Sequence, residues 1–408
     1  MAKNRRMLVA VAALVVIATV GFSSSKPSGA TTKDGHTYTI GLLTDLTGLA
    51  ASAVETSPLG IKAGIGVADQ EGYHIKYVVA DTGSTPNGAL VAAQKLVDQD
   101  HVFAVIAISG LTFGGASFLT SQGVPVIGSA SDSTEWIASQ NMFSVTNTGS
   151  FTNVYTTDGL LLKLLGVTNL GVIGFGVSPS SADSATGASL SAKAAGVKTG
   201  YLNANVPFGT TNVAPLALAM KSGGVNGFIG EVGTNTSFAV VSALRQDGVT
   251  LKGTLLPTGY GGDLTQGGPG SKQVAQGLDF LSSFEPVEMH TAATERIQAA
   301  LKKYAGVTTD PTYAEYLGYV SVDAFVDGLK AAGANPTQAS FIKTMLGITH
   351  YPAAGLAGGH TVSFGMAGRG EVEGADNCAW ITRYSGSTFH LITGAEPLCG
   401  KLIPNEKA

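Results

Sequence analysis

Short apolar runs typical of buried β-strands alternate with helix-type segments along most of the chain. The first series predicts strands at 38–43, 73–79 and 102–108, with helices at 57–69 and 87–98 between them. A connection of helix length is what parallel strands require, because the chain must cross back over the sheet before the next strand begins. The alternation therefore predicts an α/β fold with a parallel sheet and helices on both of its faces.

A second series of similar size follows a stretch of small polar residues at 146–150. It begins with a helix predicted at 152–165 and a strand at 170–175 and ends with a strand at 254–256. Between them we expect strands at 197–202 and 227–229 and helices at 188–195, 213–222 and 238–245, and after them amphipathic helices at 293–304 and 313–324. Because 408 residues exceed what one hydrophobic core usually organises, two α/β units are expected.

The N-terminus has the three-part order of a secretory signal. Lys3, Arg5 and Arg6 precede an apolar stretch at 7–22, which small residues follow. The apolar stretch is shorter than the ~20 residues of a typical transmembrane helix. We therefore expect residues 1–30 to be a signal peptide and the protein to be exported to the periplasm, cell envelope or medium. An uncleaved segment that tethers the chain to the membrane and a twin-arginine signal are the alternatives that the sequence leaves open.

Composition argues against nucleic acid as a partner. Only 13% of the residues are charged, and the formal net charge is -4. The 24 lysines and arginines are spread thinly, so no basic run provides a footprint for a phosphate backbone.

Motifs of catalysis are weak or missing from the sequence. The chain has no G-x-S-x-G elbow and no P-loop, and its seven histidines lie singly. A dinucleotide fingerprint starts at Gly174 and Gly176, but Pro179 stands at its third glycine position. We therefore expect neither enzymatic activity nor a cofactor or metal.

The chain has two cysteines, Cys378 and Cys399, both near the C-terminus. In an exported protein a lone pair of this kind is most simply a disulfide. A metal site would need more ligands at close spacing than this pair offers.

Two polar loops directly follow successive predicted strands: the loop at 108–112 follows the strand at 102–108, and the loop at 128–133 follows a strand predicted at 124–127. In open parallel sheets ligands bind outside the carboxyl ends of the strands, where such loops offer hydroxyls and backbone amides. A carboxylate or carbonyl would suit these donors. The alternative reading is that both are ordinary turns of a glycine-rich chain.

Six blocks carry a family resemblance by their order: IGLLTDLTGLA, SPLGIKAGI, VVADTGSTPNGALVAAQKLVDQDHVFAVIAISG, GVPVIGSAS, SALRQDGVTLKGTLLPTG and YAEYLGYVSVDAFVDGLKAAGANPTQASFIKTM. Together they resemble the solute-binding proteins of ABC importers of the branched-chain amino acid and amide class. The resemblance implies the type I periplasmic binding protein fold, in which two doubly wound parallel-sheet lobes are joined by a three-crossover hinge. On this pattern 38–150 and 284–350 form lobe 1, and 151–283 and 351–408 form lobe 2.

The resemblance also implies a function and a site. It predicts a monomer that captures an amino acid, an amide or a small organic acid in the cleft between the lobes and delivers it to an ABC permease in the membrane. An extracytoplasmic sensor that signals to a membrane partner is the alternative, and the sequence does not discriminate the two. The family places ligand contacts at Ser109, Gly110, Ser129, Ala130 and Ser131, and the loops of the second lobe add Ser178, Thr234 and Tyr260 as candidates.

One position departs from the family pattern. Amino-acid binders usually place a carboxylate for the ligand ammonium on the loop after the strand at 254–256, where this chain has Gly259. Asp263 and Glu231 lie nearby, but neither falls in register. Because an unpaired buried ammonium is costly, we expect leucine, isoleucine and valine to bind weakly and an amide, an organic acid or another neutral polar metabolite to be the ligand.

If residues 1–30 are a cleaved signal, the mature chain should begin near Thr31. Mass spectrometry of the exported protein measures this directly. An exported pool that retains Met1 would contradict cleavage and support the tethered alternative.

Overall fold

A computed structural model of the chain describes residues 36–129, 134–146, 152–266, 270–367, 369 and 378–408. The predicted signal peptide lies outside this part. No helix within these ranges is long and apolar enough to cross a membrane.

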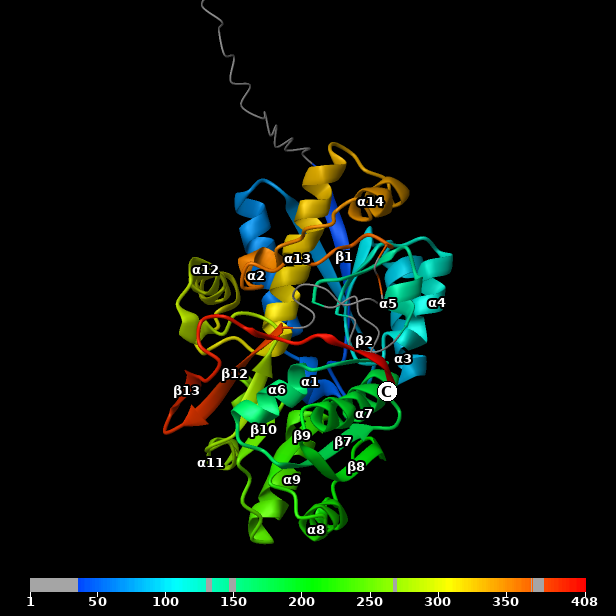
Figure 1. Cartoon of the computed structure of the whole chain (residues 1–408). Helices are drawn as coiled ribbons and strands as arrows, with labels where there is room; N and C mark the ends of the chain where they lie inside the picture. Colours follow the sequence, from blue (N-terminus) through cyan, green and yellow to red (C-terminus); the bar gives the residue numbers. More distant parts are fainter. Residues whose placement is uncertain (1–35, 130–133, 147–151, 267–269, 368, 370–377) are drawn as a thin grey trace, which may run out of the picture. The chain divides into compact units, whose positions relative to one another are not determined.

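The first sheet, whose strands β1 and β2 are labelled in Figure 1, is parallel and has five strands in the order β2-β1-β3-β4-β5. Its strands are β1 Thr37–Thr44, β2 His74–Asp81, β3 Ala104–Ile108, β4 Val126–Gly128 and β5 Met142–Ser144. The order places β1 inside the sheet, with the chain moving outward to either side of it. This is the doubly wound arrangement that the alternation of strands and helices predicts.

Helices cover both faces of this sheet because its strands are apolar on both sides. Ile40 and Ile106 belong to the same core cluster as buried residues of α2 Ser57–Gln70 and α13 Tyr313–Ala332. Leu43, from the same strand as Ile40, belongs instead to a cluster with residues of α3 Pro86–Gln94 and α4 Phe113–Ser121. Successive residues of a strand point to opposite faces, so an all-apolar strand needs cover on both.

The second sheet is also parallel and has the order β10-β9-β7-β8. Its strands are β7 Asn169–Phe175, β8 Lys198–Val206, β9 Gly227–Glu231 and β10 Gly253–Leu255. The helices of this part are α6 Thr157–Leu164, α7 Pro179–Ala194, α8 Ala214–Ser222 and α9 Thr234–Gln246. Together they confirm the predicted α/β fold class.

The C-terminal part adds antiparallel strands that the sequence reading did not predict. β11 Asp279–Ser282, β12 Cys378–Ser385 and β13 Thr388–Leu391 form a sheet, and β14 Leu398–Cys399 pairs with β12. β6 Asn153–Tyr155 pairs with the C-terminal strand β15 Leu402–Lys407.

The helix predicted at 152–165 is therefore wrong in its first turn. Residues 153–155 form strand β6, and helix α6 begins only at Thr157. The reason is pairing over a long distance, because β15 supplies hydrogen-bond partners that local propensity does not reveal.

The remaining elements are short or lie toward the end of the chain. They are the helices α1 Ala51–Val54, α5 Glu135–Ala138, α10 Asp263–Gln266, α11 Ser271–Val274, α12 Ala292–Ala300 and α14 Gln338–Met345, 3₁₀ turns at Val287–Met289 and Ala353–Gly355, and π-helical turns at Lys95–Gln99 and Leu301–Ala305. The π-helical turns continue α3 and α12, as the predicted helices 87–98 and 293–304 require. The lobe boundaries implied by the resemblance stay a prediction.

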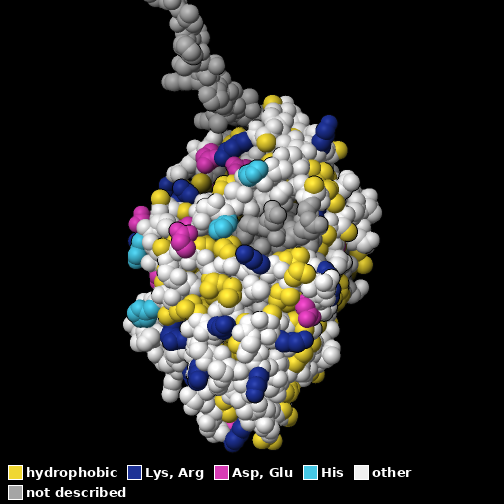
Figure 2. All heavy atoms as spheres, viewed as in Figure 1, with side chains coloured by type: hydrophobic (Ala, Val, Ile, Leu, Met, Phe, Trp, Pro, Cys, Tyr) yellow, Lys and Arg dark blue, Asp and Glu magenta, His cyan; other side chains and the backbone are white. Residues whose placement is uncertain are grey.

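Charged side chains do not gather on the face of the molecule drawn in Figure 2. They lie singly or in small groups, separated by polar and hydrophobic atoms. This scatter agrees with the low charged fraction of the sequence.

Helices α2 and α13 cross at contact distance because glycines line the crossing. A Cβ on Gly60 would lie 2.2 Å from the carbonyl oxygen of Glu315, and one on Gly318 would lie 2.6 Å from that of Ser57. Neither contact involves a flexible side chain that could move aside. The two backbones can therefore approach this closely only where the side chain is a hydrogen atom.

Gly60→Ala should lower the free energy of unfolding by about 1–3 kcal/mol or more, because overpacking forces the two helices apart. Gly187→Ala is the matched control, since Gly187 also lies within a helix but its added Cβ would come no closer than 3.8 Å to Ala408. We expect this control to be neutral or to stabilise by about 0.5–1 kcal/mol. Equal effects of the two substitutions in urea denaturation would contradict the close crossing.

Candidate functional site

A cavity of about 310 Å³ lies where the carboxyl ends of both parallel sheets converge. Asp45 directly follows β1, Ser129 follows β4, and Glu231 ends β9. The lining also includes Gly110, Leu111 and Thr146 from the first sheet's loops and Phe175, Ser178, Phe208, Gly233, Pro257 and Thr258 from the second's. Ligands of open α/β sheets bind at such strand ends.

Asp45 is the polar centre of the first sheet's side of the cavity. Its side chain is only 1% exposed, and its Oδ1 accepts hydrogen bonds from Ser109 Oγ at 2.7 Å and from Thr82 Oγ1. Both hydroxyls in turn accept from backbone amides, those of Leu111 and Ser84, so their own protons point to Asp45. Burial raises the pKa of Asp45, and the two hydroxyl donors oppose that rise. Asp45 Oδ2 has no hydrogen-bond partner within the described structure.

Glu231 is the corresponding acid on the second sheet's side. The hydroxyl of Ser181 fixes the end of β9 by donating to the main-chain oxygen of Glu231 while accepting from Phe175 N at 2.7 Å. The Glu231 side chain is half-buried at the cavity wall. Burial and, less strongly, the negative charge of Asp158 raise its pKa to about 8.

Apolar side chains form most of the remaining wall. Phe175 and Phe208 meet edge to face with their ring centroids 4.9 Å apart, and Val54, Leu111 and Val232 also line the cavity. A mainly apolar wall with a few placed polar groups is typical of small-molecule sites.

Of the candidates predicted from the sequence, Gly110, Ser129 and Ser178 line the cavity. Ser178 also caps α7 by accepting from Ser181 N. Ala130 and Ser131 lie outside the described residues.

The other candidates lie elsewhere. Ser109 is buried against Asp45 and is not part of the lining. Thr234 and Tyr260 are buried and do not belong to the lining, although Thr234 directly follows the lining residue Gly233. The Tyr260 hydroxyl donates to Glu288 at 2.7 Å and accepts from Val287 N at 3.0 Å.

The structure explains why Gly259 carries no acid. Its φ is +106°, and a Cβ there would lie 2.7 Å from a ring carbon of Phe280. Asp263 is fully buried, accepts a hydrogen bond from Gly259 N and does not line the cavity. Glu231, by contrast, faces the cavity from the neighbouring strand.

Sequence reasoning assigned no role to Asp45 and left Glu231 out of register. One signal could have found both, since each acid stands at the carboxyl end of an apolar strand. In a parallel sheet that position alone brings a side chain to the ligand edge.

The paired sheets and the cavity at their strand ends define the type I periplasmic binding protein fold. Residues 37–388 match the family model described as periplasmic binding protein, and the chain belongs to this family. A search of curated protein sequences found no match.

Several solved structures share the fold at low sequence identity. The leucine-binding protein LivK of Thermotoga maritima is 16% identical (TM-score 0.69; 87% of this chain and 97% of that chain covered). LivJ of Streptococcus pneumoniae, solved with isoleucine, is 17% identical (TM-score 0.68; 91% and 100% covered). A solute-binding protein of R. palustris, solved with 4-hydroxybenzoate, is 16% identical (TM-score 0.68; 91% and 97% covered).

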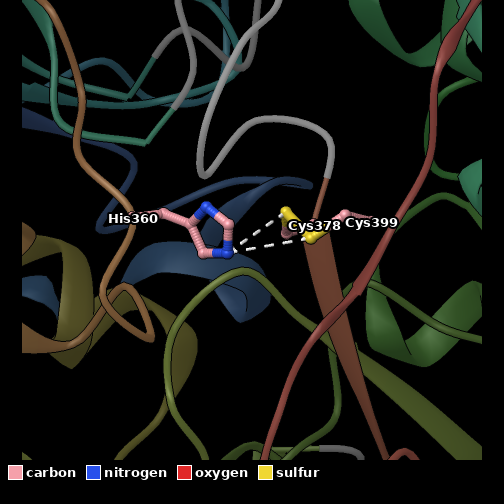
Figure 3. Close-up of side chains that lie close together, drawn as sticks. All are labelled: His360, Cys378 and Cys399. Atoms are coloured by element: carbon pink, nitrogen blue, oxygen red, sulfur yellow. Dashed lines mark hydrogen bonds between the residues drawn. A yellow bond between two sulfur atoms is a disulfide. The ribbon is translucent and has the colours of Figure 1, made fainter.

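A second cluster, away from the cavity, brings together His360, Cys378 and Cys399 (Figure 3). The two sulfurs are bonded to each other across the β12–β14 pair, which confirms the predicted disulfide. His360 Nε2 lies 3.8 Å from each sulfur. Because sulfurs bound in a disulfide are not thiolates, this cluster is a covalent clip rather than a set of metal ligands.

Removing the clip should destabilise the fold. The bridge closes a loop over 21 positions, so the double substitution Cys378→Ala/Cys399→Ala should lower the free energy of unfolding by about 3 kcal/mol. Urea denaturation measures the difference. Thiol labelling of the denatured, unreduced wild type is the control, and two reactive thiols there would contradict the bond.

Proposed function

We propose that this chain is the extracytoplasmic substrate-binding protein of an ABC importer. It captures a small polar metabolite in the cavity at the strand ends and presents it to a membrane permease. The observation that carries the proposal is the cavity itself, which both parallel sheets line with their carboxyl ends. Membership of the periplasmic binding protein family and the ABC transporter relatives of similar fold support it.

Capture requires that the two sides of the cavity move together. The first sheet contributes Asp45, Gly110 and Ser129, while the second contributes Ser178 and Glu231. A ligand that contacts both sides stabilises the closed arrangement by the free energy of those added contacts. Hinge closure is a common motion of two-lobed binding proteins.

The donors available to a ligand differ from those that the sequence suggested. The hydroxyl of Ser109 already donates to Asp45, and a ligand carboxylate nearby would meet the unpartnered oxygen of that acid. Binding of leucine, isoleucine and valine is therefore disfavoured at their carboxylate end.

A ligand screen by thermal shift tests the proposal. The panels are amino acids, amides, amines and carboxylates. We expect one of these compounds, once it is present at 100 times its own dissociation constant, to stabilise the mature chain by about 2.7 kcal/mol. Small-angle scattering with that compound should show a smaller radius of gyration. An unchanged radius at saturation would contradict closure, and a complete lack of stabilising compounds would contradict the proposed function.

A further inference from the structure

We infer that the cavity selects an organic amine, whose protonated amino group pairs with Glu231. The inference rests on the proposed function and narrows its substrate class. It follows from two acids that face one cavity from two different sheets.

Asp45 presents a buried hydrogen-bond acceptor, its Oδ2 atom, to which no described group donates. Its side chain is 1% exposed, and Oδ2 has no partner although Oδ1 has two. A buried oxygen left in this state costs free energy that a ligand donor would recover. Because Asp45 lines the cavity, the missing donor is expected to come from what fills it.

Glu231 lines the same cavity from the second sheet. No described residue donates a hydrogen bond to its carboxyl, whereas its main-chain oxygen is held by Ser181. The acidic Asp158 of α6 raises its pKa further, and Tyr313 of α13, which is hydrogen-bonded to Ser129, lies within electrostatic range of it. Its surroundings thus disfavour the ionised form until a cation arrives.

The lining carries no compensating positive charge. No lysine or arginine belongs to the described lining, and the undescribed internal segments contain none in the sequence. The N-termini of α7, α9 and α13 reach the cavity at Ser178, Gly233 and Tyr313 and attract negative charge, so an anionic ligand is the competing interpretation that the experiment must separate. The observations that favour a cation are the two carboxyl side chains and the lack of a lysine or arginine in the described lining.

The rest of the cavity suits an apolar body attached to the amine. Phe175, Phe208 and Val54 offer hydrocarbon surface, and a volume of about 310 Å³ suits a small molecule. A primary amine with an aliphatic or aromatic body matches this cavity, because its amino group can contact the acidic part of the wall and its body the apolar part.

The proton linkage has a definite sign. With a pKa of about 8, Glu231 is roughly nine-tenths protonated at pH 7, while a primary amine remains an ammonium ion. The ammonium pairs with the ionised carboxylate, so each binding event at pH 7 releases close to one proton to solvent. Apparent affinity should then rise about tenfold between pH 6 and pH 7 and level off above pH 8.

Calorimetry on the mature chain tests these steps with probes matched in shape. Pentylamine and 2-phenylethylamine are compared with hexanoate and 3-phenylpropanoate, each at pH 6, 7 and 8.5 and in two buffers of different ionisation enthalpy. We expect the amines to bind, the carboxylates not to bind, and the heat at pH 7 to depend on the buffer.

Three variants assign the effect to residues. Glu231→Gln should weaken amine binding at pH 8.5 at least tenfold and abolish both the pH dependence and the buffer dependence. Asp45→Asn should weaken binding but keep the proton release. Asp183→Asn, which removes an acid of α7 outside the lining, is the control and should behave as wild type.

The outcomes separate this inference from the proposed function. Tighter binding of the carboxylates, no binding of the amines, or an unchanged pH dependence in Glu231→Gln would overturn the inference. The proposed function would still stand if the wider screen found another ligand that compacts the chain. The buffer dependence of the wild type remains decisive even if a variant fails to fold.

Discussion

The fold depends on the close crossing of α2 and α13 against the first sheet. Gly60 and Gly318 let these helices touch backbone to backbone, and the pair covers the face of the sheet that carries Ile40 and Ile106. α13 begins at Tyr313, which lines the cavity, so the same contact also places a wall of the site. The close crossing of the two helices thus positions both the hydrophobic core and one wall of the cavity.

Two acidic side chains determine the charge of the cavity in this chain. Relatives of similar fold were solved with isoleucine and with 4-hydroxybenzoate, both of which carry a carboxylate. In this chain the hydroxyl of Ser109 is turned to Asp45, and a second acid, Glu231, faces the same cavity. The shared fold supplies the edge of the sheets where ligands bind, whereas a few side chains at that edge determine whether a cation or an anion binds.

Local sequence patterns predicted the central strands of the parallel sheets well, because strands such as β3 and β7 are buried almost throughout and read as continuous apolar runs. The pairing of β6 with β15 escaped prediction, since both segments are partly exposed and become strands by pairing with each other. The candidate site shows the same division. Gly110, Ser129 and Ser178, chosen from loops after strands, line the cavity, whereas the Tyr260 hydroxyl donates to Glu288 and Tyr260 does not belong to the lining.

By itself, the sequence determined the α/β class, the family and the pairing of Cys378 with Cys399. These follow from periodicity, block order and residue count, which need no knowledge of distant contacts. Only the tertiary structure decided which polar groups face the cavity. Asp45 and Glu231 are far apart in the chain, and the direction of each side chain depends on hydrogen bonds and packing from elements that meet only when the sheets have formed. The chemistry of the site therefore depends on contacts between segments that are distant in the sequence, and not on any one segment.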